Sequence, residues 1–188
     1  MRIEQTVVDL STDPFNPELN FKAAKEYDAL GQSASAVSFY LRTAEYGYES
    51  HKYLAYQSLL RMSMCFEDQN DRQHTVSNCI LQAMGYMPNR PEAYFLMARF
   101  QEKNSAWREC YTNAEIGLFY SDKRLEPLPV DVDYPGEYGL LFEKAVSGWW
   151  LGLKDESIVI FKDLLTKDIR EDYKGSIRYN LEKINASV

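Results

Sequence analysis

The stretch VDVDYPGEYGLLFEK raises the question of a metal site, because two carboxylates alternate in it ahead of a glycine. Asp131 and Asp133 are separated by one residue, and Gly136 follows. A calcium loop needs oxygen ligands at positions 1, 3 and 5, a glycine at position 6 and a bidentate glutamate at position 12. Counted from Asp131, position 5 is Pro135 and position 12 is Phe142. Two ligands are missing, which argues against a calcium site.

The sequence Asp-Val-Asp also matches the Asp-x-Asp pattern with which many nucleotide-sugar transferases hold a divalent metal and a diphosphate. Such a site needs an α/β sheet to present it, and this sequence has no alternation of strands and helices. We therefore interpret LEPLPVDVDYPGEYG as an extended, proline-stiffened connection between helices. Because long ordered loops often carry function, Tyr134 and Tyr138 are candidate interaction residues.

Other signatures of catalysis or metal binding are absent from the sequence. It contains no glycine-rich phosphate loop, no GxSxG and no HExxH, and His51 and His74 stand alone on predicted helices. Cys65, Cys79 and Cys110 form no CxxC pair, so we expect them to be small buried residues in a reducing compartment. A zinc site that used His74 with Cys79 would lack its other ligands. We expect no metal, no cofactor and no catalytic activity.

Charge and hydropathy exclude two classes of partner. The 188 residues include 28 acidic and 21 basic side chains, for a net charge of −7, without a Lys/Arg run that would track a phosphate backbone. The longest apolar runs, such as AVSGWWLGL, are far shorter than the roughly 20 residues that span a bilayer. The first residues, MRIEQTVVDLSTD, lack the apolar core of a secretion signal. We expect a cytoplasmic protein that binds neither nucleic acid nor membrane.

The spacing of apolar residues predicts helices almost throughout. Prolines cluster near residues 14–17, 88–91 and 127–135, and between them apolar side chains recur every three or four positions. We expect an N-terminal extended segment or linker over residues 1–16 and one helical domain over residues 17–188. Its expected hairpins cover about 17–47, 51–86, 91–120 and 137–167, and a capping helix covers 171–185. The predicted class is all-α.

Small and aromatic residues recur at corresponding places in these hairpins. Ala24, Met64, Ala98 and Ala145 align as equivalents, at steps of 40, 34 and 47 residues. Small residues let two antiparallel helices approach closely, while aromatic residues fill the gap to the next hairpin. The chain thus resembles the tetratricopeptide repeat, whose period is about 34 residues. That resemblance implies a right-handed superhelical stack of antiparallel helix hairpins, an α-solenoid. No copy carries the full signature, and the steps are uneven.

Three phrases carry a narrower resemblance. They are DPFNPELNFKAAKEYDALGQSASAVSFYLRTAE, RPEAYFLMARFQEKNSAWRECYTNAEIGL and DVDYPGEYGLLFEKAVSGWWLG. They are similar to the helical-repeat region attached to family 2 glycosyltransferases in bacteria, phages and environmental sequences. The resemblance implies an accessory, non-catalytic module that works beside a sugar-transferring domain.

The first helix of each hairpin is expected to line a concave face where a partner segment lies. The candidate binding residues on this face are Phe21, Lys25, Arg61, Phe95, Arg99, Phe142 and Trp149. Its three cations suggest a basic ladder suited to an acidic partner, unless they are surface charges paired with nearby acids. Trp149 and Trp150 are adjacent on one helix and cannot both point inward, so one of them is a candidate for an exposed docking patch, unless a large core absorbs it.

The function that the sequence favours is a scaffold that binds a protein or peptide. One alternative is an accessory domain of a glycosyltransferase system, which docks the catalytic unit or the acceptor glycan. A second alternative is a structural subunit of a larger assembly such as a phage particle. The oligomeric state is left open by the sequence.

Overall fold

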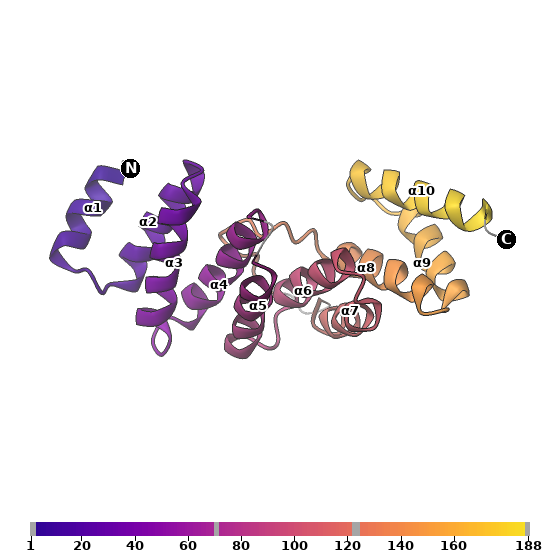
Figure 1. Ribbon diagram of the computed structural model, residues 1–188, viewed down its shortest axis with the longest axis horizontal. Helices are drawn as coiled ribbons and strands as arrows, with labels where there is room; N and C mark the ends of the chain where they lie inside the picture. The colour runs from indigo at the N-terminus through magenta and orange to yellow at the C-terminus, as the bar shows by residue number, and fades with distance from the viewer. Residues whose placement is uncertain (1–2, 70–71, 122–124, 187–188) are drawn as a thin grey trace. The chain divides into compact units, whose positions relative to one another are not determined.

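A computed structural model describes residues 3–69, 72–121 and 125–186 of the chain. Within these ranges the chain forms helices, turns and one long connection, and no residue there belongs to a β-strand (Figure 1). The helices are α1 (Ile3–Thr12), α2 (Pro17–Ala29), α3 (Ser33–Gly47), α4 (Lys52–Glu67), α5 (Gln73–Tyr86), α6 (Pro91–Lys103), α7 (Trp107–Ser121), α8 (Glu137–Trp150), α9 (Lys154–Thr166) and α10 (Glu171–Ala186). The expected all-α class is confirmed.

Consecutive helices pack in pairs. Helix α2 packs on α3, α4 on α5, α6 on α7, and α8 on α9. The hairpin pattern expected from the proline clusters is therefore confirmed, and the helix ends lie within a few residues of those predicted.

The first hairpin shows why the sequence folds in this way locally. The Asn16 side chain accepts hydrogen bonds from the backbone N–H groups of Glu18 and Leu19, and Pro17 opens α2. Ala24 on α2 and Ala36 on α3 are fully buried. Because neither side chain extends beyond its Cβ, the two helices can approach closely.

The chain divides into two compact units. Unit 1 comprises residues 1–89 and 126–132, and unit 2 comprises residues 90–125 and 133–188. The backbone therefore passes from one unit to the other three times. The prediction of a single repeat domain over residues 17–188 stays a prediction.

Unit 1 has its core between α2, α3, α4 and α5. Its largest fully buried side chains include Tyr40, Tyr56, Leu60 and Ile80. The segment 126–132, which arrives from the long connection, also belongs to this unit and is visible beside α4 in Figure 1.

Unit 2 has its core where α8 meets α9 and α10. Ala145, Phe161 and Leu164 pack there with Ile177 and Ile184 of α10. The last helix therefore covers the apolar side of the preceding hairpin, as expected of a capping helix. In the same unit, α8 packs on both α6 and α7.

The N-terminal segment differs from the prediction. An extended stretch was expected over residues 1–16, but residues 3–12 form helix α1, which packs on α2. Thr6 and Leu10 lie one helical turn apart and are both buried, and the Thr6 hydroxyl donates to Glu26 at 3.2 Å. Tertiary packing outweighs the β-branched run Thr-Val-Val, which locally favours an extended backbone.

Candidate functional site

The connection between α7 and α8 alternates buried and exposed side chains. In unit 1, Val130 and Val132 are buried, whereas Asp131 between them is exposed. The alternation is that of an extended backbone, in which neighbouring side chains point in opposite directions. The expected extended connection is therefore present, and its valines anchor it.

Arg61 on α4 contacts this segment through its backbone. The Arg61 Nη1 donates to the carbonyl oxygen of Asp131 at 2.6 Å. Its Nε and Nη2 lie 2.9 and 2.7 Å from Oδ2 of Asp28 on α2. The Tyr40 hydroxyl donates to that same oxygen, and burial followed by the negative Asp28 raises the pKa of Tyr40. In unit 1, Asp28 of the chain itself is thus the ion-pair partner of Arg61.

Arg99 on α6 meets the next part of the connection, which belongs to unit 2. Its Nη1 lies 2.6 Å from Oδ2 of Asp133. Arg170, just before α10, places its Nη1 3.1 Å from Oδ1 of the same carboxylate. The following residue, Tyr134, packs on Phe95 of α6 with the ring centroids 5.5 Å apart. Asp133 and Tyr134 are thus each held by a side chain of α6.

The other predicted binding residues occupy different environments. Lys25 is exposed with its Nζ 5.2 Å above the ring centre of Phe21, which is itself a core residue at 5% exposure. Phe95 is fully buried, and its ring packs on Tyr134 of the connection. Phe142 is partly buried against Phe161 and Tyr173. Tyr138 also packs edge-on against Tyr173, and half-buried Trp149 lines a pocket.

The basic ladder is divided between the two units. Lys25 and Arg61 lie in unit 1 and Arg99 lies in unit 2. Both arginines bind acids of this chain: Arg61 binds Asp28, and Arg99 binds Asp133, which is 34 residues away in sequence. A role of these residues in binding a partner stays a prediction.

A pocket of about 340 Å³ lies between α8, α9 and α10 of unit 2. Its lining residues are Val146, Trp149, Trp150, Phe161, Tyr179, Asn180, Lys183 and Ile184. Trp150 and Tyr179 are 62% and 59% exposed, so the pocket is flanked by large aromatic surface that water reaches. Of the two adjacent tryptophans, Trp150 is the exposed one, and its ring stacks on that of Trp107 with the centroids 5.2 Å apart.

Two lysines stand over aromatic rings of this pocket. The Lys154 Nζ lies 4.8 Å from the ring centre of Trp149, and the Lys183 Nζ lies 5.3 Å from that of Tyr179. Cations over ring faces are held by the electron-rich face while their outer side stays hydrated. The pocket thus combines apolar walls with positive charge, a combination suited to an apolar side chain next to a carboxylate.

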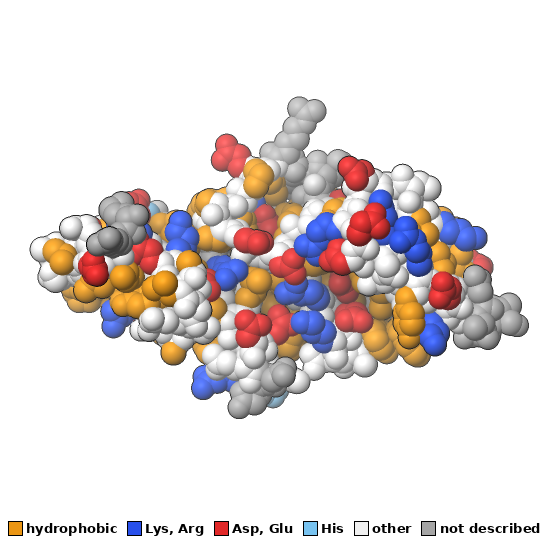
Figure 2. All heavy atoms as spheres, turned by 90° about the horizontal axis from the view of Figure 1, so that it is seen from above, with side chains coloured by type: hydrophobic (Ala, Val, Ile, Leu, Met, Phe, Trp, Pro, Cys, Tyr) orange, Lys and Arg blue, Asp and Glu red, His pale blue; other side chains and the backbone are white. Residues whose placement is uncertain are grey.

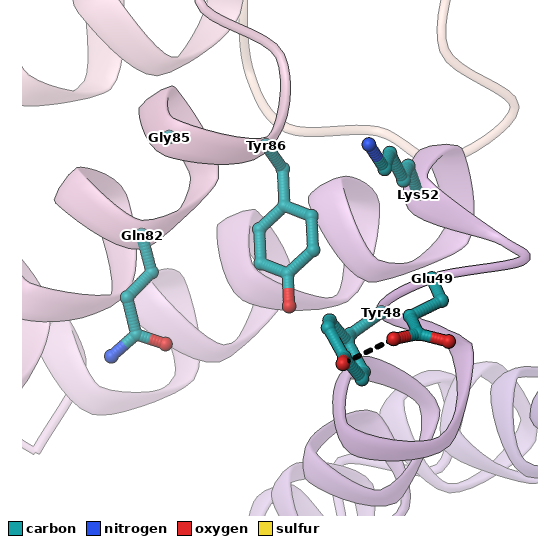
Figure 3. A pocket seen from close by; sticks show the side chains of 6 residues that line it. All are labelled: Tyr48, Glu49, Lys52, Gln82, Gly85 and Tyr86. Carbon is teal, nitrogen blue, oxygen red and sulfur yellow. Dashed lines mark hydrogen bonds between the residues drawn. The ribbon is translucent and has the colours of Figure 1, made fainter.

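A second, more open pocket of about 550 Å³ lies in unit 1 (Figure 3). Tyr48 and Glu49, in the turn after α3, are joined by a hydrogen bond from the tyrosine hydroxyl, and the Tyr86 hydroxyl at the end of α5 points toward them. The remaining lining residues are Lys52, Gln82 and Gly85. This pocket carries one base and one acid, and its aromatic side chains are the two tyrosines.

Sequence reasoning missed Trp150, Tyr179 and Arg170 as site residues. The adjacent tryptophans carried a signal for Trp150, since a helix cannot bury both. Tyr179 is exposed on α10, whereas the isoleucines of that helix face the core. The spacing of the isoleucines in the sequence indicates which side of the helix is apolar, and it could have pointed to Tyr179. Nothing local marked Arg170, because its partner Asp133 is 37 residues away in sequence.

The buried cysteines lack the features of activated nucleophiles. The three cysteines are free and buried, and burial raises the pKa of Cys65 and Cys79 to about 11 and of Cys110 to about 12. Thiols held in this form are poor nucleophiles. Within residues 3–69, 72–121 and 125–186, no group of three or more His, Cys, Asp or Glu side chains could hold a metal ion.

Glu143 on α8 is a buried carboxyl of unit 2, as is Glu92 on α6. Burial, followed by the negative charge of Glu102, raises the pKa of Glu143 to about 8, against the opposing effect of Arg99 and Lys103. The Glu143 Oε2 has no hydrogen-bond partner among the described residues. Glu143 lines neither of the two pockets described above.

The surface charge is mixed. In the space-filling view of Figure 2, Lys and Arg side chains lie beside Asp and Glu side chains over much of the face that is drawn. This pattern agrees with the many ion pairs between neighbouring helices and loops, such as Lys144 with Glu115 and Glu156.

No helix in the described part of the chain is both long enough and apolar enough to cross a membrane.

Comparison with known proteins gives structural relatives only. No family model matches the chain, and no curated protein sequence matches it. A crystal structure of MamA superposes with a TM-score of 0.68 at 17% identity, over 93% of this chain and 89% of that one. Another MamA crystal structure superposes with a TM-score of 0.66 at 16% identity, and the match covers 87% of this chain and 79% of that one. The crystal structure of TTC0263, a thermophilic TPR protein in Thermus thermophilus, superposes with a TM-score of 0.58 at 15% identity. The match covers 95% of this chain and 88% of that one.

At these identities the likeness concerns the fold alone. Together with the observed helix pairs, it shows that the chain is a tetratricopeptide-like α-solenoid of helix hairpins.

Proposed function

We propose that this chain is a non-catalytic module that binds a protein partner through the aromatic pocket of unit 2. The observation that carries the proposal is the exposure of Trp150 and Tyr179 beside a pocket lined by Trp149 and Lys183. Exposed aromatic side chains around a concave apolar site are the usual energetic centres of protein interfaces. Stacked helix hairpins commonly present such surfaces to partners, and the fold is in keeping with that role.

The pocket favours a partner segment with an apolar side chain followed by a carboxylate. The apolar side chain would occupy the space between α8 and α10, displacing water from Val146 and Trp149. The carboxylate would lie near Lys154 or Lys183, whose ammonium groups stand above the pocket's aromatic rings.

Selection from a displayed peptide library tests this proposal. We expect enriched peptides to share an apolar residue next to an acid, and to lose at least about tenfold in affinity with a Trp150→Ala/Tyr179→Ala variant. The matched control is Phe119→Ala, which removes another highly exposed aromatic ring of unit 2 that does not line this pocket. Peptides that bind the double variant as tightly as the unaltered protein would show that the pocket is not the binding surface.

A glycan is the second candidate ligand, and the exposed face of Trp150 is what favours it. The negative faces of aromatic rings attract C–H groups such as those on sugars. This candidate goes with the proposed role beside a family 2 glycosyltransferase, in which the module would hold the acceptor. Titration with a panel of oligosaccharides, using the same variants, separates the two candidates, because only glycan binding gives a response to sugars that Trp150→Ala abolishes.

Membership of a larger assembly, as in a phage particle, stays a prediction from sequence, as does the cytoplasmic location. The three free, buried cysteines are in keeping with a reducing compartment.

A further inference from the structure

The carboxylate of Asp133 is held by two arginines that come from different parts of unit 2. Arg99 of α6 approaches Oδ2 at 2.6 Å, and Arg170, which precedes α10, approaches Oδ1 at 3.1 Å. Each carboxylate oxygen therefore faces one guanidinium group. This is the arrangement with which proteins recognise a carboxylate from another molecule.

The neighbouring Tyr134 supplies a second anchor. Its ring packs on Phe95, whose ring also lies beneath the Arg99 guanidinium at 5.6 Å. Burial, followed by Glu92 and Glu137, raises the pKa of the Tyr134 phenol, so it stays neutral in this contact. An acid and an aromatic residue in succession, one on arginines and one on a phenylalanine, resemble a bound peptide motif more than a simple turn.

The two ion pairs of Asp133 differ in their exposure to solvent. The Arg170 side chain is 46% exposed and also lies 3.1 Å from Asp172, so its pair with Asp133 contributes little. The Arg99 side chain is 18% exposed and lies 2.6 Å from the carboxylate, so this pair is the better shielded of the two. Asp133 has a φ of 55°, a left-handed conformation that aspartate adopts more readily than most residues.

We propose that Arg99 and Arg170 form a carboxylate-binding site for an acidic-aromatic segment of a protein partner, and that Asp133 and Tyr134 occupy this site as an internal stand-in. The proposal rests on the proposed function in that the chain binds protein segments. It assigns a second surface, made of residues that do not line the aromatic pocket. A partner segment of the type Asp-Tyr would displace the chain's own copy.

Because the chain's own segment occupies the proposed site, we expect the unaltered protein to bind a free peptide weakly. A tethered ligand has a high effective concentration, and the apparent affinity for a free one falls in proportion to the unoccupied fraction. The probe is a fluorescein-labelled synthetic peptide with the sequence VDVDYPG, which copies residues 130–136. Its anisotropy is measured with the full-length protein and with an Asp133→Ala/Tyr134→Ala variant in which the site is vacated.

We expect the vacated variant to bind this peptide at least about tenfold more tightly than the unaltered protein. Adding Arg170→Ala to the vacated variant should abolish the gain, as should a peptide with asparagine in place of its second aspartate. The matched control is Glu137→Ala, which removes one exposed acid next to the segment and leaves Asp133 in place; it should bind like the unaltered protein. Circular dichroism confirms that each variant is folded.

Equal binding by the unaltered and vacated proteins, or no binding by either, would overturn the proposal. So would a gain in affinity that survives Arg170→Ala. These outcomes are separable from failure of the proposed function, because library peptides that need Trp150 and Tyr179 can still be selected when VDVDYPG does not bind. Loss of both kinds of binding would remove the proposed function itself.

Discussion

Glu143 illustrates how one buried side chain makes the stability of this protein depend on pH. It is 4% exposed, and its carboxyl has a pKa of about 8 in the folded state, compared with about 4.3 in an unfolded chain. A carboxyl whose pKa is raised on folding stabilises the native state fully below the unfolded pKa. That contribution is lost as pH rises through the folded pKa.

We therefore expect the free energy of unfolding to fall by a few kcal/mol as the pH rises from about 5 to about 9, because of Glu143. The size follows from about 1.4 kcal/mol for each unit by which the folded and unfolded pKa values differ. Glu143→Gln removes the ionisation and should flatten the profile, so the variant should be the more stable protein at pH 9. Urea unfolding at several pH values measures this. Glu109→Gln, at an exposed position on α7, should leave the profile unchanged. A glutamine variant with the pH profile of the unaltered protein would contradict the assignment.

Helix α7 approaches α6 and α8 closely at a position without a side chain. A Cβ on Gly117 would lie 2.5 Å from Cδ2 of Leu140 on α8 and 3.1 Å from Cβ of Tyr94 on α6. Leu140 is fully buried, so its side chain has other groups packed around it. Gly117 therefore permits three helices of unit 2 to pack against one another.

Gly117→Ala should destabilise the protein by about 1 to 3 kcal/mol, because the added methyl overpacks this contact. Its control is Gly175→Ala on α10, where nothing lies within 4 Å of the new methyl. That substitution should stabilise the helix by about 0.5 to 1 kcal/mol, since alanine loses less backbone entropy than glycine. Thermal unfolding of both variants gives the comparison, and equal melting temperatures would rule out close packing at Gly117.

In the complete molecule, the two units are interleaved in sequence. Residues 126–132 belong to unit 1 but are joined at both ends to unit 2. When unit 2 unfolds, this segment loses the tethers that place Val130, Val132 and the Asp131 carbonyl in unit 1. We therefore expect the chain to unfold in one cooperative step.

The positions of the tryptophans make that expectation measurable. All three, Trp107, Trp149 and Trp150, lie in unit 2, so fluorescence reports unit 2 while circular dichroism reports the helices of both units. The two urea transitions should coincide, and Gly117→Ala should move both midpoints together. Two separate transitions, with only the fluorescence midpoint moved by Gly117→Ala, would instead show independent domains.

Much of the fold was readable from local patterns. Proline clusters and apolar periodicity located the hairpins, because helix formation depends on neighbours three and four residues away. The small residues Ala24, Ala98 and Ala145 were correctly expected at helix contacts, and all three are fully buried. Successive helical residues point about 100° apart, so the two adjacent tryptophans were expected to point in different directions, but which of them is exposed was left open.

Other features depended on contacts between residues far apart in the chain. Residues 3–12 form a helix because α2 offers a surface for Thr6 and Leu10, which outweighs their local preference. Phe95 looked like a residue of a binding face but is fully buried, because periodicity indicates which side of a helix is apolar without indicating what covers it. Arg99 was a candidate for binding a partner or for pairing with a nearby acid, and folding instead brings it Asp133 from 34 residues away. Short-range spacing thus sufficed for the helices and their pairing, whereas long-range packing decided which side chains remain for a partner.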